Sequence, residues 1–237
     1  MPSLDKHQLV GFLVALARIP GQLAAGVLLG PSVLEVLAPR AQPAIAKPSD
    51  HAGHHPDRRT MDITQLILDD HQEQRRLFAI LEQIDRADTA ALGAVWNRLA
   101  AFLEVHAEAE EQHFYPELLR VGKGAGGVDP EAETKDAIGD HNDIRNAVAE
   151  VAHHEVGSDG WYEAIAEANE ANSDHMAEEE REGLTDFRRH AELPLRHDLA
   201  VAFITFEATH FAGVKPVDKD PSSYVREVEE DIAASND

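Results

Sequence analysis

The sequence predicts an all-α domain, built as an up-down bundle of four helices with one extra helix near the C-terminus. Apolar residues recur at helical spacing from residue 62 onward, and strand signals are missing. The pattern Asp-His, followed by His-x-x-x-Glu, occurs twice, and its two histidines are 35 and 34 residues apart in the two copies. A helix of roughly 25 residues plus a short loop fills this interval. Four helices running up and down would therefore each place one histidine at a similar height.

Each predicted helix is justified by an apolar face and by signals at its ends. The first has Ile67, Leu77 and Leu81 on one face, and the second has Leu92 and Leu99. Capping residues, a proline and two glycine-containing turns at 122–127 and 157–160 separate the elements. The first expected helix runs from a cap at Asp62 or Thr64 to Ile84, and the second from a cap at Thr89 to an interruption near Pro116. The third runs from about Pro130 to Val156, and the fourth from a cap at Ser158 or Asp159 to about Arg189. The extra helix runs from Leu199 to Phe211 and is followed by a polar tail.

The chain is expected to have three parts: an N-terminal extension and linker (1–60), the four-helix body (61–190) and a C-terminal helix with its tail (191–237). Residues 1–60 contain six basic and four acidic residues, so the acidic excess lies in the rest of the chain. The apolar run before Arg18 and Pro20 is too short to span a membrane. It is also a weak match to a signal peptide. We expect a flexible extension, no membrane association and a cytoplasmic location.

Composition excludes several classes of function. The formal net charge of −23 leaves no basic surface for nucleic acid. The absence of cysteine removes disulfides, thiolate metal sites, iron–sulfur clusters and cysteine nucleophiles. Any metal must therefore be held by His, Asp and Glu, a ligand set suited to non-heme iron, manganese or zinc.

The repeated pattern predicts a two-metal site. His106 and Glu110 are four residues apart, as are His175 and Glu179, so each pair projects from one helix face. His71 and His141 would add one nitrogen each from the other two helices. The predicted metal ligands are His71, His106, Glu110, His141, His175 and Glu179. Each carboxylate has two oxygens and can bridge two metals, and two divalent ions would keep open positions for oxygen, peroxide or nitric oxide.

These residues resemble those of the hemerythrin-like, or HHE cation-binding, domains over roughly residues 61–190. The matching segments are Asp70-His71, His106 to Glu111 with Phe114-Tyr115-Pro116 after it, Asp140-His141, and His175 to Glu180. The resemblance implies a four-helix bundle holding two non-heme iron ions joined by an oxo or hydroxo group, with manganese or zinc as alternative metals. It implies that His71 and His106 bind one iron, that His141 and His175 bind the other, and that Glu110 and Glu179 bridge them.

Two departures from the oxygen-carrying hemerythrins matter. They have a second histidine one turn after the ligand of the third helix, where this chain has Arg145. They also place the last carboxylate five residues after its histidine, which makes Glu180 the alternative to Glu179. We favour Glu179, which repeats the four-residue spacing of the other half.

Several neighbouring residues are open to two interpretations. His113 is either one layer above the site or a proton-relay group beside it. Arg75 and Arg145 are either solvated or paired with carboxylates such as Glu111 and Glu180. Asp70 and Asp140 precede the ligands by one residue and so point about 100° away, as expected for surface or interhelical ion pairs.

The sequence thus predicts a non-heme diiron protein that reacts with hydrogen peroxide or oxygen in redox-stress defence or sensing. A catalase-like or peroxide-reducing activity is one possibility, with no side chain acting as a nucleophile. The alternative is a non-catalytic module that binds oxygen, nitric oxide or iron. The expected partner is a small diatomic molecule or a peroxide, and the missing histidine at position 145 favours peroxide chemistry over reversible oxygen carriage.

Overall fold

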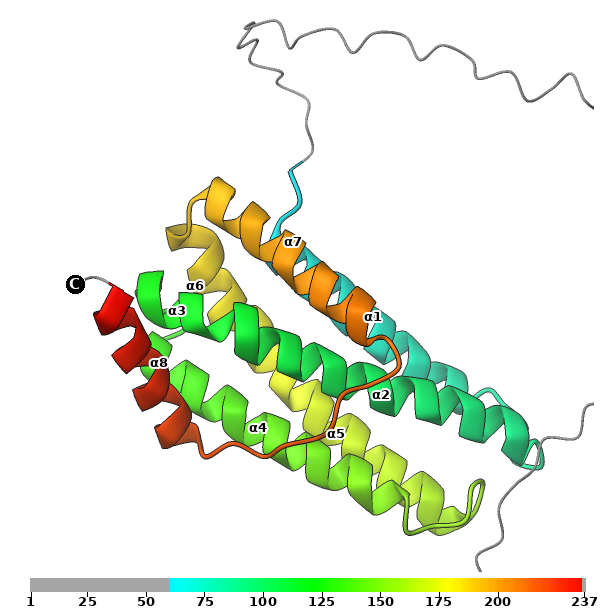
Figure 1. Ribbon diagram of the computed structural model, residues 1–237. Coiled ribbons are helices and arrows are strands. Elements are labelled where there is room, and N and C mark those ends of the chain that lie inside the picture. The colour runs from blue at the N-terminus through cyan, green and yellow to red at the C-terminus, as the bar shows by residue number, and fades with distance from the viewer. Residues whose placement is uncertain (1–59, 236–237) are drawn as a thin grey trace, which may run out of the picture. The chain divides into compact units, whose positions relative to one another are not determined.

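The computed structural model describes residues 60–235, and these residues form eight helices (Figure 1). The predicted N-terminal extension lies outside the described residues, apart from Thr60. The helices are α1 (Ile63–Leu81), α2 (Thr89–His113), α3 (Tyr115–Val121), α4 (Pro130–Val151), α5 (Asp159–Arg181), α6 (Gly183–His190), α7 (Leu193–His210) and α8 (Pro221–Ser235).

The prediction of an all-α fold is confirmed for this part of the chain. Between residues 60 and 235 the only β-type pairing is an isolated bridge from Ala125 to Val128. The long helices pack as neighbours, α1 on α2, α2 on α4, α4 on α5 and α5 on α1. The finer claim, that these four form an up-down bundle, stays a prediction. None of the described helices has the length and apolarity needed to cross a membrane.

Side-chain caps fix where the long helices begin. Asp62 accepts a hydrogen bond of 3.0 Å from the backbone N–H of Thr64, and Ser158 accepts one from Trp161, as two of the predicted alternatives require. For α2 the expected cap was wrong by one residue. Asp88, not Thr89, accepts the bond from the backbone N–H of Ala91, because Thr89 is already helical.

Three of the long helices end earlier than predicted, the first of them at Leu81 rather than Ile84. The predicted fourth helix breaks at Glu182, where φ is −111° and ψ is −79°, and resumes as α6. The N–H of Gly183 there donates to Oε1 of Glu133, and a Cβ on residue 183 would lie 2.8 Å from that oxygen. The third ends at Val151 rather than Val156, because the N–H groups of Ala152, His153 and His154 bond to carbonyls three residues back, which ends the α-helical pattern before the turn at Gly157.

The C-terminal part contains two helices rather than one helix and a polar tail. The predicted Leu199–Phe211 helix corresponds to α7, which begins six residues earlier and packs on α1 and α2 (Figure 1). The second, α8, packs on α3 and α4. Asp220 accepts a hydrogen bond of 2.8 Å from the backbone N–H of Ser223, Pro221 opens the helix, and Val225 is buried.

The hydrophobic core is divided into two clusters. One gathers Trp96 and Trp161, and the other gathers Phe114, Phe187 and Phe203. On α1, α2 and α4 the histidine of the repeated pattern lies between the residues of one cluster and those of the other, and His175 of α5 lies between one cluster on α5 and the other on α6. The packing of the fold thus positions a polar layer between two apolar ones.

Candidate metal centre

Four buried histidines form this polar layer, one from each long helix. His71 lies on α1, His106 on α2, His141 on α4 and His175 on α5, and none is more than 4% exposed. Their rings form two edge-to-face pairs. The centroids of His71 and His106 are 5.3 Å apart, and those of His141 and His175 are 4.6 Å apart. The structure therefore brings together all four histidines that the repeat singled out, in the pairs expected.

Glu110 lies between the two pairs and is fully buried. Its Oε1 is 2.9 Å from Nε2 of His106 and 3.9 Å from Nε2 of His71. Its Oε2 is 3.3 Å from Nε2 of His141. One carboxylate thus presents one oxygen to each half of the site. His71, His106 and Glu110 form one potential metal-ligating group, and Glu110, His141 and His175 form a second.

The two consecutive glutamates of α5 have different surroundings. Oε2 of Glu179 is 3.3 Å from Nε2 of His71, on the inner side of the histidine layer. The other oxygen of Glu179 accepts a hydrogen bond of 2.8 Å from the hydroxyl of the buried Tyr115. Glu180 is partly exposed and lies at the opposite edge of the His71 ring, with its Oε1 3.0 Å from Nδ1. Glu179 therefore offers one oxygen to the centre, while Glu180 lies behind it.

Every one of the four histidines has a carboxylate oxygen beside its Nδ1 atom. Each carboxylate comes from the long helix before it in the order α1, α2, α4, α5, and α5 supplies the carboxylate for α1, which closes the cycle. Because an ionised carboxylate only accepts hydrogen bonds, each of these carboxylates favours the tautomer with the ring proton on Nδ1, which leaves the Nε2 lone pair to bind a metal. The pairs are Asp70 of α1 with His106 of α2 (3.3 Å), Glu111 of α2 with His141 of α4 (2.7 Å), Asp140 of α4 with His175 of α5 (3.4 Å), and Glu180 of α5 with His71 of α1 (3.0 Å).

Charged partners keep the outer carboxylates ionised. Burial of Glu111 opposes its ionisation, but the hydrogen bond from His141 and the charge of Arg145 lower its pKa to about 2. The hydrogen bond from His71 does the same for Glu180, together with Arg75, and lowers the pKa of Glu180 to about 2.

The two arginines of the repeat pair with these carboxylates, as one of the two interpretations predicted. Nη2 of Arg75 is 2.8 Å from Oε1 of Glu180, and Nη2 of Arg145 is 3.0 Å from Oε1 of Glu111. Arg145 is buried, and its Nε also donates to both oxygens of Glu104 at 3.0 and 3.1 Å. The position where an oxygen carrier has another histidine is thus filled by a guanidinium group turned toward acidic partners.

One structural observation fits bound metal, most clearly in the half of the site that holds His71 and His106, since Nε2 of His141 and Nε2 of His175 are hydrogen-bonded to each other at 3.2 Å. Five buried atoms at the centre have no hydrogen-bond partner: Nε2 of His71, Nε2 of His106, both oxygens of Glu110 and Oε2 of Glu179. Leaving buried polar groups unpaired is costly, so a cluster of them facing one point calls for a cation. Imidazole nitrogens and carboxylate oxygens without sulfur are donors that suit non-heme iron.

Sequence reasoning missed three residues near the centre and left the place of a fourth, His113, open. Tyr115 was given no role of its own, although it directly follows Phe114 in the quoted motif. Glu104 and Glu207 belong to no motif; Glu207 comes from α7, and its Oε1 lies 3.9 Å from Nδ1 of His106. His113 had two interpretations, one layer above the site or a proton-relay group beside it, and its ring packs edge-to-face on Phe206 of α7. No hydrogen bond within residues 60–235 links His113 to the four histidines.

Comparison with known proteins gives one result. The family model described as the hemerythrin HHE cation binding domain matches residues 62–185. This range contains all four histidines and ends within α6. Searches of curated proteins and of solved structures gave no match.

Proposed function

The chain belongs to the hemerythrin HHE cation-binding domain family, and on this basis we propose that it is a non-heme diiron protein that reacts with hydrogen peroxide. The observation that carries the proposal is the group of five buried nitrogen and oxygen atoms on His71, His106, Glu110 and Glu179 that face one another without forming a hydrogen bond. In this assignment His71 and His106 hold one iron and His141 and His175 hold the other. Glu110 is shared between them, and Glu179 adds one oxygen on the His71 side.

When bound, two such ions would give two electrons to one peroxide, which with two protons becomes two waters, and would take two electrons back from a second peroxide, which becomes oxygen and releases two protons. No external reductant is needed for this balance. The chain itself fixes the geometry. The carboxylates behind each Nδ1 hold the rings in one orientation and in one tautomer.

Two further residues determine how the metal ligands are arranged. Tyr115 holds Glu179 through one oxygen and so fixes which oxygen faces inward. Arg145 favours peroxide turnover over oxygen carriage, because a guanidinium bound to Glu111 and Glu104 adds no nitrogen ligand beside His141. We therefore expect the ion held by His141 and His175 to have the more open coordination.

Metal analysis and an oxygen electrode test the proposal together. Protein purified from iron-supplied cells should contain two iron ions per chain, and adding peroxide should release one oxygen for every two peroxides consumed. Chelator-treated protein is the control and should release none. Zinc in place of iron would overturn the diiron assignment. A reversible spectral change under oxygen or nitric oxide, without oxygen release from peroxide, would instead favour a binding or sensing module.

A further inference from the structure

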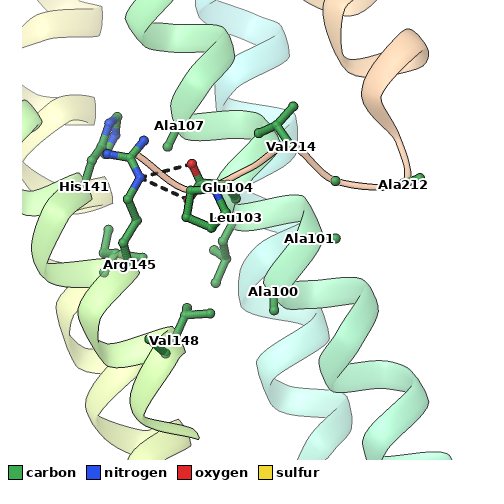
Figure 2. Close-up of a pocket in the computed structure, with 14 residues that line it drawn as sticks. Ala100, Ala101, Leu103, Glu104, Ala107, His141, Arg145, Val148, Ala212 and Val214 are labelled. Atoms are coloured by element: carbon green, nitrogen blue, oxygen red, sulfur yellow. Dashed lines mark hydrogen bonds and ion pairs between the residues drawn. The ribbon is translucent and has the colours of Figure 1, made fainter. Parts of the chain in front are cut away.

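An apolar pocket of about 330 Å³ lies beside the predicted metal centre, between α2 and α4 (Figure 2). Leu103 and Ala107 line it from α2, and Ile144 and Val148 line it from α4. One end of the pocket reaches His141. The residues lining the rest of it are almost all aliphatic, so water inside gains few hydrogen bonds.

The roof of this pocket comes from outside the matched family domain. The segment that joins α7 to α8 crosses over it and contributes Ala212, Gly213, Val214 and Pro216, whereas the family match ends at residue 185. Lys219 anchors the end of this segment. Its backbone N–H and C=O bond to the side chain of Asn142, and its ammonium group contacts Glu111 and Glu108. The pocket is therefore a feature of this chain's C-terminal part.

The charges at the inner end of the pocket are already paired. Figure 2 shows Arg145 and Glu104 facing each other there, with His141 alongside. Nη1 of Arg145 is 3.3 Å from Oδ1 of Asn142, and Nη2 is bound to Glu111, so each guanidinium nitrogen has an acceptor. An anionic ligand would meet the carboxylates of Glu104 and Glu111 beside Arg145 and be repelled by them, and a cationic one would have to displace Arg145 from Glu104.

We infer that this pocket binds an uncharged, largely apolar small molecule. Its volume is about twice that of a cavity of roughly 150 Å³ that accepts benzene, so a bicyclic ring or a medium alkyl chain fits. An aliphatic lining and a closed ion pair at the far end both select against a charged head group. The inference concerns binding alone and does not depend on which metal the centre holds or on peroxide turnover.

Three naphthyl compounds of matched size test it: 1-naphthalenemethanol, which is neutral, 1-naphthoate, an anion, and 1-naphthylmethylammonium, a cation. Their fluorescence is titrated with the full-length protein, as purified and after chelation. We expect saturable binding of the alcohol at one site per chain in both preparations, and binding of either ion at least tenfold weaker.

Pocket-filling variants show where the alcohol binds. Ala100→Phe and Val148→Phe each add a ring to the pocket lining, and each should weaken binding at least tenfold. Ala166→Phe, which lines a separate hollow between α1 and α5, is the matched control and should bind as the wild type does. Circular dichroism confirms that each variant is folded. The inference is overturned by absence of saturable binding, by equal binding of the alcohol and the anion, or by unchanged binding in both folded pocket variants.

Discussion

The hydroxyl of Tyr115 lies 2.8 Å from Oε1 of Glu179 and donates a hydrogen bond to it, although both side chains are buried. Tyr115 belongs to the short helix α3, and Glu179 belongs to α5. The bond therefore ties the turn after α2 to the helix that supplies the last histidine. It leaves Oε2 of Glu179 as the only oxygen of this carboxylate that faces His71.

Tyr115→Phe should weaken metal binding without emptying the site. The change leaves one buried oxygen of Glu179 without its donor, and hydrogen bonds to charged groups contribute about 1.5–3 kcal/mol. Loss of such an outer contact typically lowers metal affinity by about 10–100-fold. Competition with a chelator measures the change. Tyr162→Phe is the matched control, since Tyr162 packs against Trp161 and Arg86, and an equal loss in both variants would contradict the prediction.

Glu110→Ala should remove both iron ions, because its two oxygens face the two histidine pairs. We expect the iron content to fall from two per chain to below one. Glu178→Ala is the control. It changes the exposed residue that directly precedes Glu179 on α5, and it should keep both ions. Elemental analysis of the two purified variants gives the answer, and retention of one full iron in Glu110→Ala would show that the carboxylate is not shared.

The neighbouring glutamates of α5 should behave differently. Glu179→Ala is expected to lose iron from the His71 side, since Oε2 of Glu179 faces Nε2 of that ring. Glu180→Ala should keep both ions and bind them more weakly, because it only removes the partner of Nδ1. The opposite result, with full iron after Glu179→Ala and none after Glu180→Ala, would assign the ligand role to Glu180.

Arg145→Ala should cost stability as well as alter reactivity. It leaves Glu104 and Glu111 buried without their shared cation, and breaking a buried pair from one side costs about 3–5 kcal/mol. Urea unfolding measures the loss. The double variant Arg145→Met, Glu104→Gln should recover part of it, because no unpaired Glu104 charge remains. We also expect iron content to change less than the rate of oxygen release from peroxide.

Glu133 should make the metal-free protein less stable as the pH rises from about 4.5 to 8. Burial, together with the charges of Glu179 and Glu182, raises the pKa of Glu133 from 4.5 to about 8. The folded state therefore keeps a proton that the unfolded state releases in this interval, and the free energy of unfolding falls by about 2–4 kcal/mol.

Replacing Glu133 tests this pH dependence directly. Glu133→Gln cannot release a proton and should flatten the fall in the urea midpoint between pH 5 and 8. Glu131→Gln, an exposed change on the same first turn of α4, should keep the wild-type slope. Identical slopes in wild type and Glu133→Gln would show that another group is responsible.

Much of the centre was accessible from the sequence because its residues follow helical geometry. A histidine and a glutamate four residues apart must share a face, and the interval of about 35 residues sets one histidine per helix. The sequence placed Asp70 and Asp140 in surface or interhelical ion pairs, but it could not name their histidine partners, which depend on how neighbouring helices are rotated against each other. Whether Asp70 reaches His106 or water is decided by packing between α1 and α2.

The C-terminal contributions were missed for a different reason. Glu207 lies near His106, and Lys219 contacts Glu111. The two residues of each pair are more than 100 positions apart in the sequence, and no local sequence pattern predicts such a contact. Helix α8 did have a local signal, an aspartate followed by proline at 220–221. Its polar composition concealed that signal, because only Val225 of this helix is buried.

Because the carboxylate and histidine pairs form a closed cycle, all four histidines are aligned only when all four long helices are in place. Each ring is aligned by a side chain from the preceding helix, so a partly folded chain that lacks any one long helix leaves the next histidine free to turn. Metal would then be captured late, after the fourth helix has docked. The iron content of a preparation would report the fraction of molecules that had assembled fully.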